Sequence, residues 1–579
     1  MRTVYAMDAG WKRKTAEAEE QTYSLPLQTA LLQPEEPAEL YRVFSVPDGD
    51  NIGDFFLILE HLTAAFDVLI DGKFVAHAES LFAPVCIDIS AYVVKGQQQT
   101  LSLQLQPAAA PDSAFTFGSA KIIGTHKSHF DLTVPGASPL SVQTSFTDEG
   151  VTVTVDAALV NPNNYDIVIY RLVDPAGKTV GIRTERPTAP TTVFTLPKPM
   201  LWDGVHAAYK YRLEAVLKRD AAVLDVAELS FGIRKAQLDP SGLFRLNGLK
   251  IPLGGVALLP APADSTEMEL LHTLDANCVK IFTLYPDEKL LDLCDTLGII
   301  VFFTFSVDTA DRETELAGTI KLLQSHPSVC FLCCDTRDLS LLKQFTDTVH
   351  KYAPEMLTVG GCDILDEESL SDAVPDLLLL KISETDGSAE VLELETKVTA
   401  ALKAHPDYRF AVFADAPDAL AQTEDAGAAF SVWHEKIWRI FYNKKNVVAY
   451  FAGYLTDGDT PDATPGLVCA DHDGIKDAFW FYRTQFSADG FVKLCAPEHT
   501  STTRKLIDIK CYTNTPPIRL TVNGKQKKKY KCDAISDSVY VFRNIKLRKR
   551  NNTIVISTSA GTDSEVIYRL RRAHGTQTE

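Results

Sequence analysis

The sequence predicts a multidomain α/β and all-β protein: a (β/α)8 TIM barrel, preceded by jelly-roll and immunoglobulin-like β-sandwiches and followed by a C-terminal β-sandwich. Three observations predict this architecture. The chain has 579 residues, enough for about three to five domains of the usual 100–200 residues. Both ends show short strands with period-two alternation, as half-buried antiparallel strands do. The middle instead alternates continuous apolar runs with helical segments, which is typical of a parallel sheet covered on both faces.

Residues 1–125 are predicted to form the jelly-roll domain. Short strands separated by turn residues run through this segment, among them DFFLILEHL, FDVLIDGKFVAHA and TLSLQLQ. The pair Asp71-Gly72 predicts a two-residue hairpin, because glycine accepts a positive φ without a Cβ clash. Residues 126–236 are predicted to form the immunoglobulin-like sandwich, from VTVTVDAALV, YDIVIYRLVD and YKYRLEAVLK to the closing FGIRK.

Residues 237–485 are predicted to form the barrel. Apolar runs such as CVKIFTLY, IIVFFTF, VCFLCCD and LLLLKIS alternate with helical stretches such as DEKLLDLCDTLG, and the segment has the size of a (β/α)8 domain. Residues 486–579 again contain short strand-like runs and are predicted to form the last sandwich. This segment is basic, since residues 493–579 hold 18 Lys or Arg against 7 Asp or Glu, whereas the whole chain has a net charge of −19.

Composition excludes several classes of protein. No apolar run approaches the roughly 20 residues of a membrane helix, and the N-terminal segment has no apolar stretch typical of a secretory signal, so a cytoplasmic location is expected. The acidic net charge argues against nucleic-acid binding. No metal-ligand spacing or glycine-rich phosphate loop occurs, and no cofactor is predicted. Cys330, Cys333 and Cys334 lie in an apolar run and are interpreted as buried thiols.

A series of short motifs follows the chain in order. The first domain contains FDVLIDG at 66–72, and the second ends with Leu201-Trp202 and FGIR at 231–234. FRLNG at 244–248, LDLCDTLG at 291–298 and HPSV at 326–329 lie in the barrel segment, and VNGK at 522–525 lies in the last sandwich. In this order the motifs resemble glycoside hydrolase family 2, the β-galactosidase and β-glucuronidase family. The resemblance covers nearly the whole chain and implies the same four-domain fold.

The resemblance also implies where catalytic carboxyl groups should lie. The family's acid/base glutamate follows the HPS segment at a strand end, and that position holds Arg337 here. Arginine stays protonated and cannot exchange a proton with a leaving group. Asp335 is the nearest substitute, because period-two alternation places it on the same side of the strand. The family's nucleophile position holds Asp415, whose carboxylate is withdrawn by roughly 1.5 Å relative to glutamate. A capping or solvated aspartate is the structural alternative.

Further substrate-site positions of the family are altered. The family's arginine is Lys280 here, an expected asparagine is Lys381, and the tryptophan beneath the sugar is Tyr454. Scaffold motifs are therefore preserved while site motifs are lost. This pattern predicts a pseudo-glycosidase, a carbohydrate-binding or assembly scaffold that has lost catalysis. The alternative is an active retaining β-glycosidase of the β-galactosidase type with a rearranged acid/base.

A third hypothesis places the function in the basic C-terminal domain. As an interaction protein, the chain would bind an anionic partner or a second copy of itself through basic residues that the sequence clusters in two runs. These residues are Lys527, Lys528, Lys529, Arg548, Lys549 and Arg550. The alternative is a set of solvated lysines and arginines that discourage pairing between sheet edges.

Overall fold

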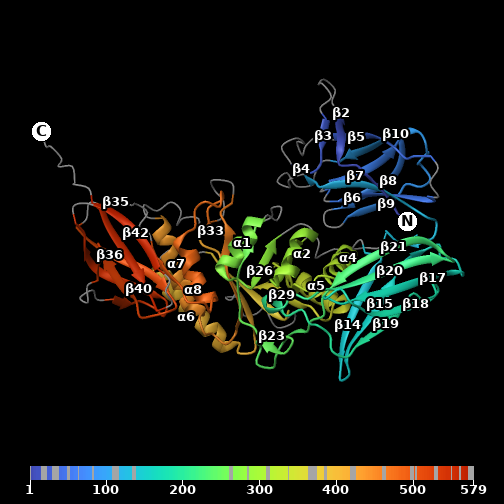
Figure 1. The fold of residues 1–579 in the computed structure, drawn as a ribbon. Helices are drawn as coiled ribbons and strands as arrows, with labels where there is room; N and C mark the ends of the chain where they lie inside the picture. Colours follow the sequence, from blue (N-terminus) through green and yellow to red (C-terminus); the bar gives the residue numbers. More distant parts are fainter. Residues whose placement is uncertain are drawn as a thin grey trace.

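The computed structural model describes residues 2–14, 22–28, 38–48, 52–60, 62, 64–106 without 81–83, 116–133, 138–259, 265–282, 286–307, 313–336, 338–362, 375–383, 388–417, 426–458, 465–495, 501–502, 505–526, 532–548, 551–559 and 563–570. Within these ranges the chain forms antiparallel sandwiches at both ends and a closed parallel barrel between them, which confirms the predicted fold class (Figure 1). No helix of the described part combines the length and apolar character needed to cross a bilayer.

The first sandwich packs two antiparallel sheets around Trp11, Phe66 and Leu103. One sheet has the order β1 (Thr3–Ala6), β12 (Ser119–Thr125), β6 (Asp54–Glu60), β9 (Val85–Asp88). The other has the order β3 (Thr22–Ser24), β2 (Ala9–Lys14), β5 (Ala38–Ser45), β10 (Gln98–Leu105), β7 (Ala64–Ile70), β8 (Lys73–Ser80), and β4 (Leu27–Gln28) pairs separately with β11 (Thr116–Phe117). Asp71 and Gly72 both have positive φ, 49° and 74°, so the predicted tight hairpin joins β7 to β8.

The second sandwich is built the same way around Val153, Tyr170 and Leu213. Its sheets are β14 (Leu140–Thr147), β15 (Gly150–Ala157), β19 (Thr192–Leu196) and β18 (Thr179–Glu185), β17 (Asp166–Val173), β20 (Tyr211–Arg219), β21 (Ala222–Phe231). A short pair, β13 (His129–Phe130) with β16 (Leu159–Val160), lies beside them, and η1 (Gly204–His206) precedes β20. The alternating VTVTV segment buries its valines, as its period predicts.

The barrel closes through pairing of its first and last strands. Its strands are β25 (Leu253–Leu258), β26 (Cys278–Phe282), β27 (Ile300–Phe305), β28 (Val329–Cys334), β29 (Leu357–Cys362), β30 (Leu377–Ile382), β31 (Phe410–Ala414) and β32 (Val447–Thr456), and β33 (Gly466–Val468) adds to β32. A small sheet of β22 (Ala236–Leu238), β23 (Phe244–Leu246) and β24 (Leu249–Lys250) precedes it. Phe244 of this sheet packs on Phe331 at 5.2 Å between ring centres, within the apolar cluster of the barrel interior.

Helices cover the outer face of the barrel strands. They are α1 (Ser265–Leu274), α2 (Glu288–Leu297), α4 (Glu313–Leu323), α5 (Leu339–Tyr352), α6 (Ser388–Ala404), α7 (Ala426–Phe441) and α8 (Asp477–Phe486). Asp287 caps α2 by accepting from the backbone N–H groups of Lys289 and Leu290, and Gly298 ends it with a φ of 76°. The predicted helix DEKLLDLCDTLG therefore forms, with its aspartate as the N-cap and its glycine as the C-cap.

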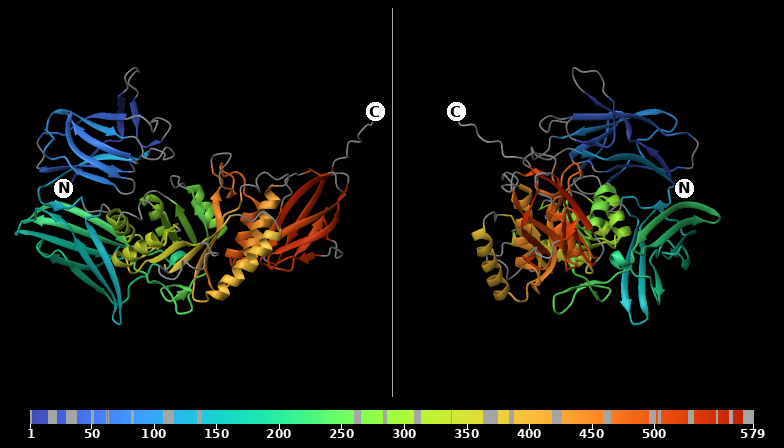
Figure 2. Two further views of the ribbon diagram at one scale, coloured as in Figure 1. Left: turned by 180° about the vertical axis from the view of Figure 1, so that it is seen from behind. Right: turned by 60° about the vertical axis from the view of Figure 1, so that its left-hand side comes forward.

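The last sandwich lies on the opposite side of the barrel from the first two (Figure 2). Its sheets are β34 (Val492–Leu494), β36 (Leu506–Thr513), β40 (Val539–Lys546), β39 (Cys532–Ala534) and β35 (Ser501–Thr502), β42 (Asp563–Leu570), β41 (Asn551–Ser557), β37 (Arg519–Val522), β38 (Lys525–Gln526). Of the two basic runs, Arg548 is described and exposed, whereas Lys527, Lys528, Lys529, Lys549 and Arg550 lie outside the described residues. The interaction role of this domain stays a prediction.

Candidate active site

Side chains that point into the barrel form its polar end layer. Each strand alternates between an outer face that packs on the helices and an inner face that fills the barrel. In β26, for example, Val279 and Ile281 belong to the outer core, whereas Cys278 and Phe282 belong to the inner one. Near the carboxyl ends of the strands, the same alternation turns a set of polar side chains inward. These are Lys280, Thr304, Asp335, Lys381, Asp415 and Tyr454.

Lys280, which is buried, and Asp335, which is exposed, form an ion pair in this layer. The Lys280 ammonium lies 3.1 Å from Asp335 Oδ2 and donates a 2.5 Å hydrogen bond to Thr304 Oγ1. It also lies 4.1 Å from the ring centre of Phe282. Lys280 has no exposed surface, whereas the Asp335 side chain is 33% exposed. Because a buried cation needs compensating partners, these three contacts account for a lysine in the barrel interior.

Lys381 and Asp415 form a second ion pair in the same layer. Their Nζ and Oδ2 atoms are 2.8 Å apart, with Lys381 largely exposed and Asp415 only 7% exposed. The backbone N–H of Asp415 donates to the carbonyl of Ile382 at 2.9 Å, so this residue prolongs the register of β31 beside β30. Asp415 is therefore held at the strand end, facing inward, with its carboxylate against an ammonium group.

Three aromatic rings lie beside these ion pairs. Phe282, Phe413 and Tyr454 contact one another, with ring centres 5.3–6.0 Å apart. Burial, together with the negative charges of Asp415 and Asp335, raises the pKa of the Tyr454 phenol to about 12. Both carboxylates thus act on one phenol, which stays protonated at neutral pH and can donate a hydrogen bond.

The geometry limits what these groups can do. A retaining glycosidase needs one protonated carboxyl group and one carboxylate free to attack, about 5–5.5 Å apart. Here each carboxylate contacts the ammonium group of a lysine, so neither is presented as an unpaired acid or nucleophile. The layer instead offers aromatic edges, a phenol and the exposed ammonium group of Lys381, which are groups that bind a polar ligand.

The structure brings together five of the six residues singled out from the sequence. Asp335, Asp415, Lys280, Lys381 and Tyr454 share the layer, and Arg337 lies outside the described residues. Their roles in catalysis or binding stay predictions. Sequence reasoning did not single out Phe282 and Phe413 as site residues, although each lies two positions from Lys280 or Asp415 and alternation alone turns it to the same side.

The cysteine run of β28 is buried. Cys330, Cys333 and Cys334 have no exposed surface, and burial raises the pKa of the last two thiols to about 12. A thiol that stays protonated is a poor nucleophile and metal ligand. The interpretation of this run as buried thiols is confirmed.

We expect Lys280→Met to lower the free energy of unfolding by about 1–3 kcal/mol, because it leaves Asp335 in the barrel without its cation. The cost stays at the lower end for a broken buried pair because Asp335 keeps contact with solvent. Urea denaturation measures this difference. Lys397→Met is the control, and should cost no more than about 1 kcal/mol, since Lys397 and its partner Glu393 are both exposed. Equal costs for the two variants would contradict this assignment.

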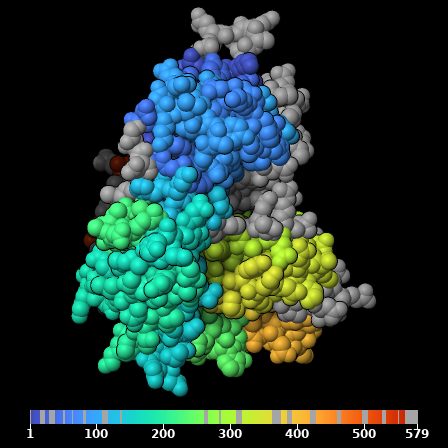
Figure 3. Space-filling view, turned by 90° about the vertical axis from the view of Figure 1, so that its right-hand side faces the viewer, coloured from blue at the N-terminus to red at the C-terminus, as the bar shows by residue number. Residues whose placement is uncertain are grey.

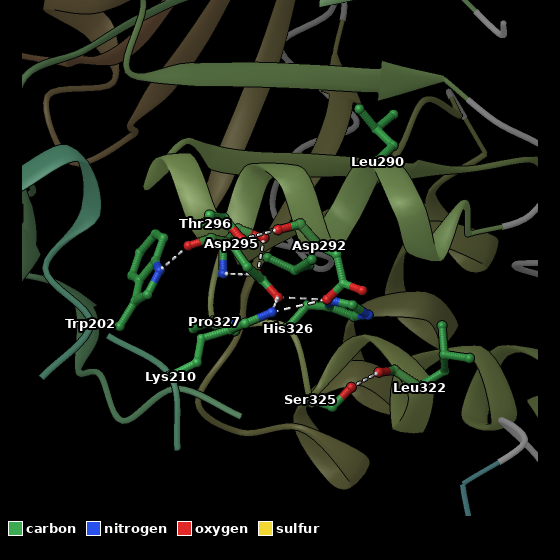
Figure 4. Close-up of polar contacts among 12 residues, drawn as sticks. Trp202, Lys210, Leu290, Asp292, Asp295, Thr296, Leu322, Ser325, His326 and Pro327 are labelled. Carbon is green, nitrogen blue, oxygen red and sulfur yellow. Dashed lines mark hydrogen bonds and ion pairs between the residues drawn. The ribbon is translucent and has the colours of Figure 1, made fainter. Parts of the chain in front are cut away.

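The motifs that carried the family resemblance meet elsewhere, between the second sandwich and the barrel (Figure 4). Buried Asp295 of α2 accepts hydrogen bonds from the backbone and hydroxyl of Ser328 at 3.0 and 2.6 Å, and lies 2.9 Å from His326 Nδ1. Trp202 donates its indole N–H to the Asp295 carbonyl at 2.8 Å. Arg234 donates to the backbone carbonyls of Pro327 and Val329. These contacts define a polar junction, and Figure 3 shows the two domains pressed together.

This polar junction contains three groups with the types and spacing of metal ligands: Asp292, Asp295 and His326. Lys210 already supplies a cation to both carboxylates, 2.9 Å from Asp292 and 3.3 Å from Asp295. Both oxygens of Asp295 are also engaged by Ser328 and His326. The cluster is therefore explained as an ionic connection between domains.

Comparison with known proteins agrees with the fold. No protein-family model matches the chain. It is 25% identical over 433 residues to a β-glucuronidase of Bacteroides fragilis, which covers 63% of this chain and 60% of that enzyme. The match thus spans less than two thirds of the relative's length.

Solved structures show the same architecture. An FMN-binding β-glucuronidase from Facaelibacterium prausnitzii matches with a TM-score of 0.85 and 17% identity, covering 100% of this chain and 99% of that one. A β-glucuronidase from glycoside hydrolase family 2 matches with a TM-score of 0.74 and 15% identity, covering 99% and 69%. The fold is that of glycosidases in which a (β/α)8 barrel is flanked by β-sandwiches. More narrowly, the chain is similar to glycoside hydrolase family 2 β-glucuronidases in its architecture.

Proposed function

We propose that this protein is a pseudo-glycosidase, which binds carbohydrate at the end layer of its barrel without hydrolysing it. The observation that carries the proposal is the pairing of both candidate carboxylates with lysines, Asp335 with Lys280 and Asp415 with Lys381. The sequence adds that the position expected for the acid/base is Arg337. A site arranged in this way has neither an acid for the leaving group nor an unpaired nucleophile.

Carbohydrate is the ligand class that the relatives' names support, since they are β-glucuronidases and β-galactosidases. The carboxyl ends of the strands are also where barrel proteins place their ligand sites. Tyr454 combines a ring face with a protonated hydroxyl, which suits the apolar face and hydroxyl rim of a sugar. We further propose a cytoplasmic location, supported by ten described cysteines that are all free thiols.

A working retaining β-glycosidase is the second candidate. It is favoured by the inward orientation of both Asp335 and Asp415 in one layer, near the same phenol. In this mechanism Asp415 would attack the anomeric carbon and Asp335 would protonate the leaving oxygen. Both lysines would first have to move away from the carboxylates.

Hydrolysis of nitrophenyl β-glycosides separates the two candidates. Purified wild-type protein and Asp415→Asn are assayed on the galactoside, glucuronide, glucoside and mannoside. We expect no turnover by the wild type above that of the variant on any of them. Turnover that disappears in Asp415→Asn would overturn the pseudo-glycosidase proposal and establish Asp415 as the nucleophile.

Calorimetric titration with the corresponding free sugars tests the binding half of the proposal. We expect saturable binding of at least one sugar, weakened about tenfold or more by Tyr454→Ala, because stacking and a hydrogen bond are lost together. Tyr442→Ala is the control, because Tyr442 is exposed and directly follows the last residue of helix α7. Absence of binding to every sugar would reject a carbohydrate site in the barrel.

A further inference from the structure

A cavity of about 430 Å³ lies in the first sandwich, beside the second half of strand β5. Strand β2 pairs with β5 only from Glu39 to Tyr41, so the residues of β5 that follow lie beyond the end of this pairing. The cavity occupies this place, between residues 42–45 of β5 and residues 5–7 at the end of β1. Its volume falls in the range of about 300–1,000 Å³ that is usual for small-ligand sites.

Arg42 occupies an inward-facing position of β5. Leu40 and Phe44, two positions before and after it, both belong to the buried core of the sandwich. Because side chains of a strand alternate between its faces, Arg42 is turned to the same inner side. Its partner in register on β10 is Leu101, which has no exposed surface. The sequence thus places a cation where the alternation calls for an apolar side chain.

The charge of Arg42 is poorly compensated by the described part of the chain. Its Nη2 donates one hydrogen bond, to the Ala6 carbonyl at 3.3 Å, and its Nη1 is buried with no acceptor among the described residues. Burial lowers the pKa of the guanidinium, and the charge of Asp8 raises it only in part. Asp8 is exposed and accepts instead from the Ala120 backbone N–H at 2.9 Å. A charge in such a position is costly unless an opposite charge joins it.

The rest of the lining defines the kind of anion that fits. Met7, Val43 and Phe44 add apolar surface, whereas Ser45 and Gln98 add polar groups. Arg42 is the one charged residue among the described residues that line the cavity. A single cation matches an anion of one charge, whereas phosphate and sulfate carry about two at neutral pH. The apolar walls favour an anion with a carbon skeleton.

We propose that this cavity binds an organic monocarboxylate through Arg42. The planar guanidinium matches the two oxygens of a carboxylate with a pair of charge-assisted hydrogen bonds. The carboxylate can belong to an aliphatic acid, whose chain the apolar walls would contact, or to a sugar acid, whose hydroxyl groups would face Ser45 and Gln98. Both present the same group to Arg42. The cavity belongs to the first sandwich, so the proposal does not depend on the function proposed for the barrel.

Calorimetric titration of the full-length protein with sodium hexanoate and with sodium glucuronate, at constant ionic strength set by chloride, tests the proposal. We expect saturable binding of at least one of them, weakened about tenfold or more by Arg42→Met, since the paired hydrogen bonds and the charge are removed together. Arg42→Lys keeps the charge without the planar fork and should weaken binding less than Arg42→Met. Arg186→Met is the control of equal charge change, because Arg186 is exposed and belongs to the second sandwich.

Urea denaturation with and without the bound acid provides a second measurement. A ligand that binds only the folded state raises the denaturation midpoint of the wild type by mass action. We expect this rise in Arg186→Met as well, but not in Arg42→Met. The midpoints without ligand show that Arg42→Met is folded, which we expect because methionine retains the apolar stem of the side chain and removes only the poorly compensated charge.

Absence of saturable binding of both acids by the wild type, or equal weakening in Arg186→Met, would overturn the proposal. Glucuronate binding that is lost in Tyr454→Ala but kept in Arg42→Met would place that ligand in the barrel and would also contradict a site at Arg42. Hexanoate binding that is lost only in Arg42→Met would support the cavity whatever the barrel binds, and would assign it to aliphatic acids. Glucuronate binding lost in Arg42→Met and kept in Tyr454→Ala would assign it to sugar acids.

Discussion

Asp295→Ala is expected to lower the free energy of unfolding of the unit formed by the second sandwich and the barrel by about 3–5 kcal/mol, the usual cost of breaking a buried ionic network from one side. Asp295 is 1% exposed, and its carboxylate joins Ser328, His326 and Lys210. Its removal leaves those donors buried without their acceptor. Urea denaturation followed by circular dichroism measures the loss.

Asp292→Ala is the matched control for this prediction. It removes the same chemical group from the same helix and the same Lys210, but the Asp292 side chain is 62% exposed. Exposed ion pairs contribute only about 0–1 kcal/mol, so the control should stay close to the wild type. If both variants lost the same stability, the polar junction would not be the connection that the contacts indicate.

The pH dependence of the polar junction follows from the same carboxyl group. Burial alone would raise the pKa of Asp295, but hydrogen bonds from His326 and Ser328 and the charges of His326 and Lys210 bring it below its usual value. A carboxyl with a depressed pKa in the folded state stabilises the protein above its unfolded pKa of about 4, and this contribution is lost as the pH falls further. In Asp295→Ala this part of the acid dependence should be absent.

Asp477→Asn is expected to stabilise the barrel and the last sandwich at pH 8 by about 2–3 kcal/mol, at 1.36 kcal/mol for each unit of pKa shift. Asp477 begins α8 beside the last sandwich, and burial raises the pKa of its carboxyl from 3.8 to about 6, against the attraction of Lys510 and Lys493. The folded state therefore retains a proton that the unfolded chain releases. This group's contribution to stability is complete below about pH 4 and is lost as the pH rises through 6.

Denaturation at pH 4 and pH 8 tests the sign of this effect. Asparagine resembles the protonated carboxyl, so the variant and the wild type should be equally stable at pH 4 and differ at pH 8. Asp473→Asn removes a negative charge four residues away at an exposed position and should change stability little at either pH. A destabilised Asp477→Asn at pH 8 would show that the folded protein favours the ionised form of the Asp477 carboxyl group.

Much of the fold could be predicted because it depends on local periodicity. Apolar runs such as Ile300–Phe305 indicate strands buried on both faces, and alternating runs such as Gly150–Ala157 indicate strands of a sandwich. Period two also places Asp335 and Asp415 on the inner side of their strands without any knowledge of the tertiary structure. The same alternation could have identified the residues of the polar end layer, including Phe282 and Phe413, which the sequence analysis did not single out.

Partnerships between side chains could not be predicted in this way. Lys280 and Asp335 are 55 positions apart and meet because β26 and β28 flank β27 in a closed barrel. In the sequence, the motifs around Trp202, Asp295 and His326 indicated only a family resemblance. In the structure, these residues form one polar junction between domains.

The sequence by itself determined the types and order of the domains and the strand ends at which candidate site residues lie, because periodicity and turn signals act over a few residues. The contact of each candidate carboxylate with a lysine arises only when the strands close into a barrel. Coulomb and hydrogen-bond energies fall steeply with distance, so a charge has a chemical role only once folding has chosen its neighbours.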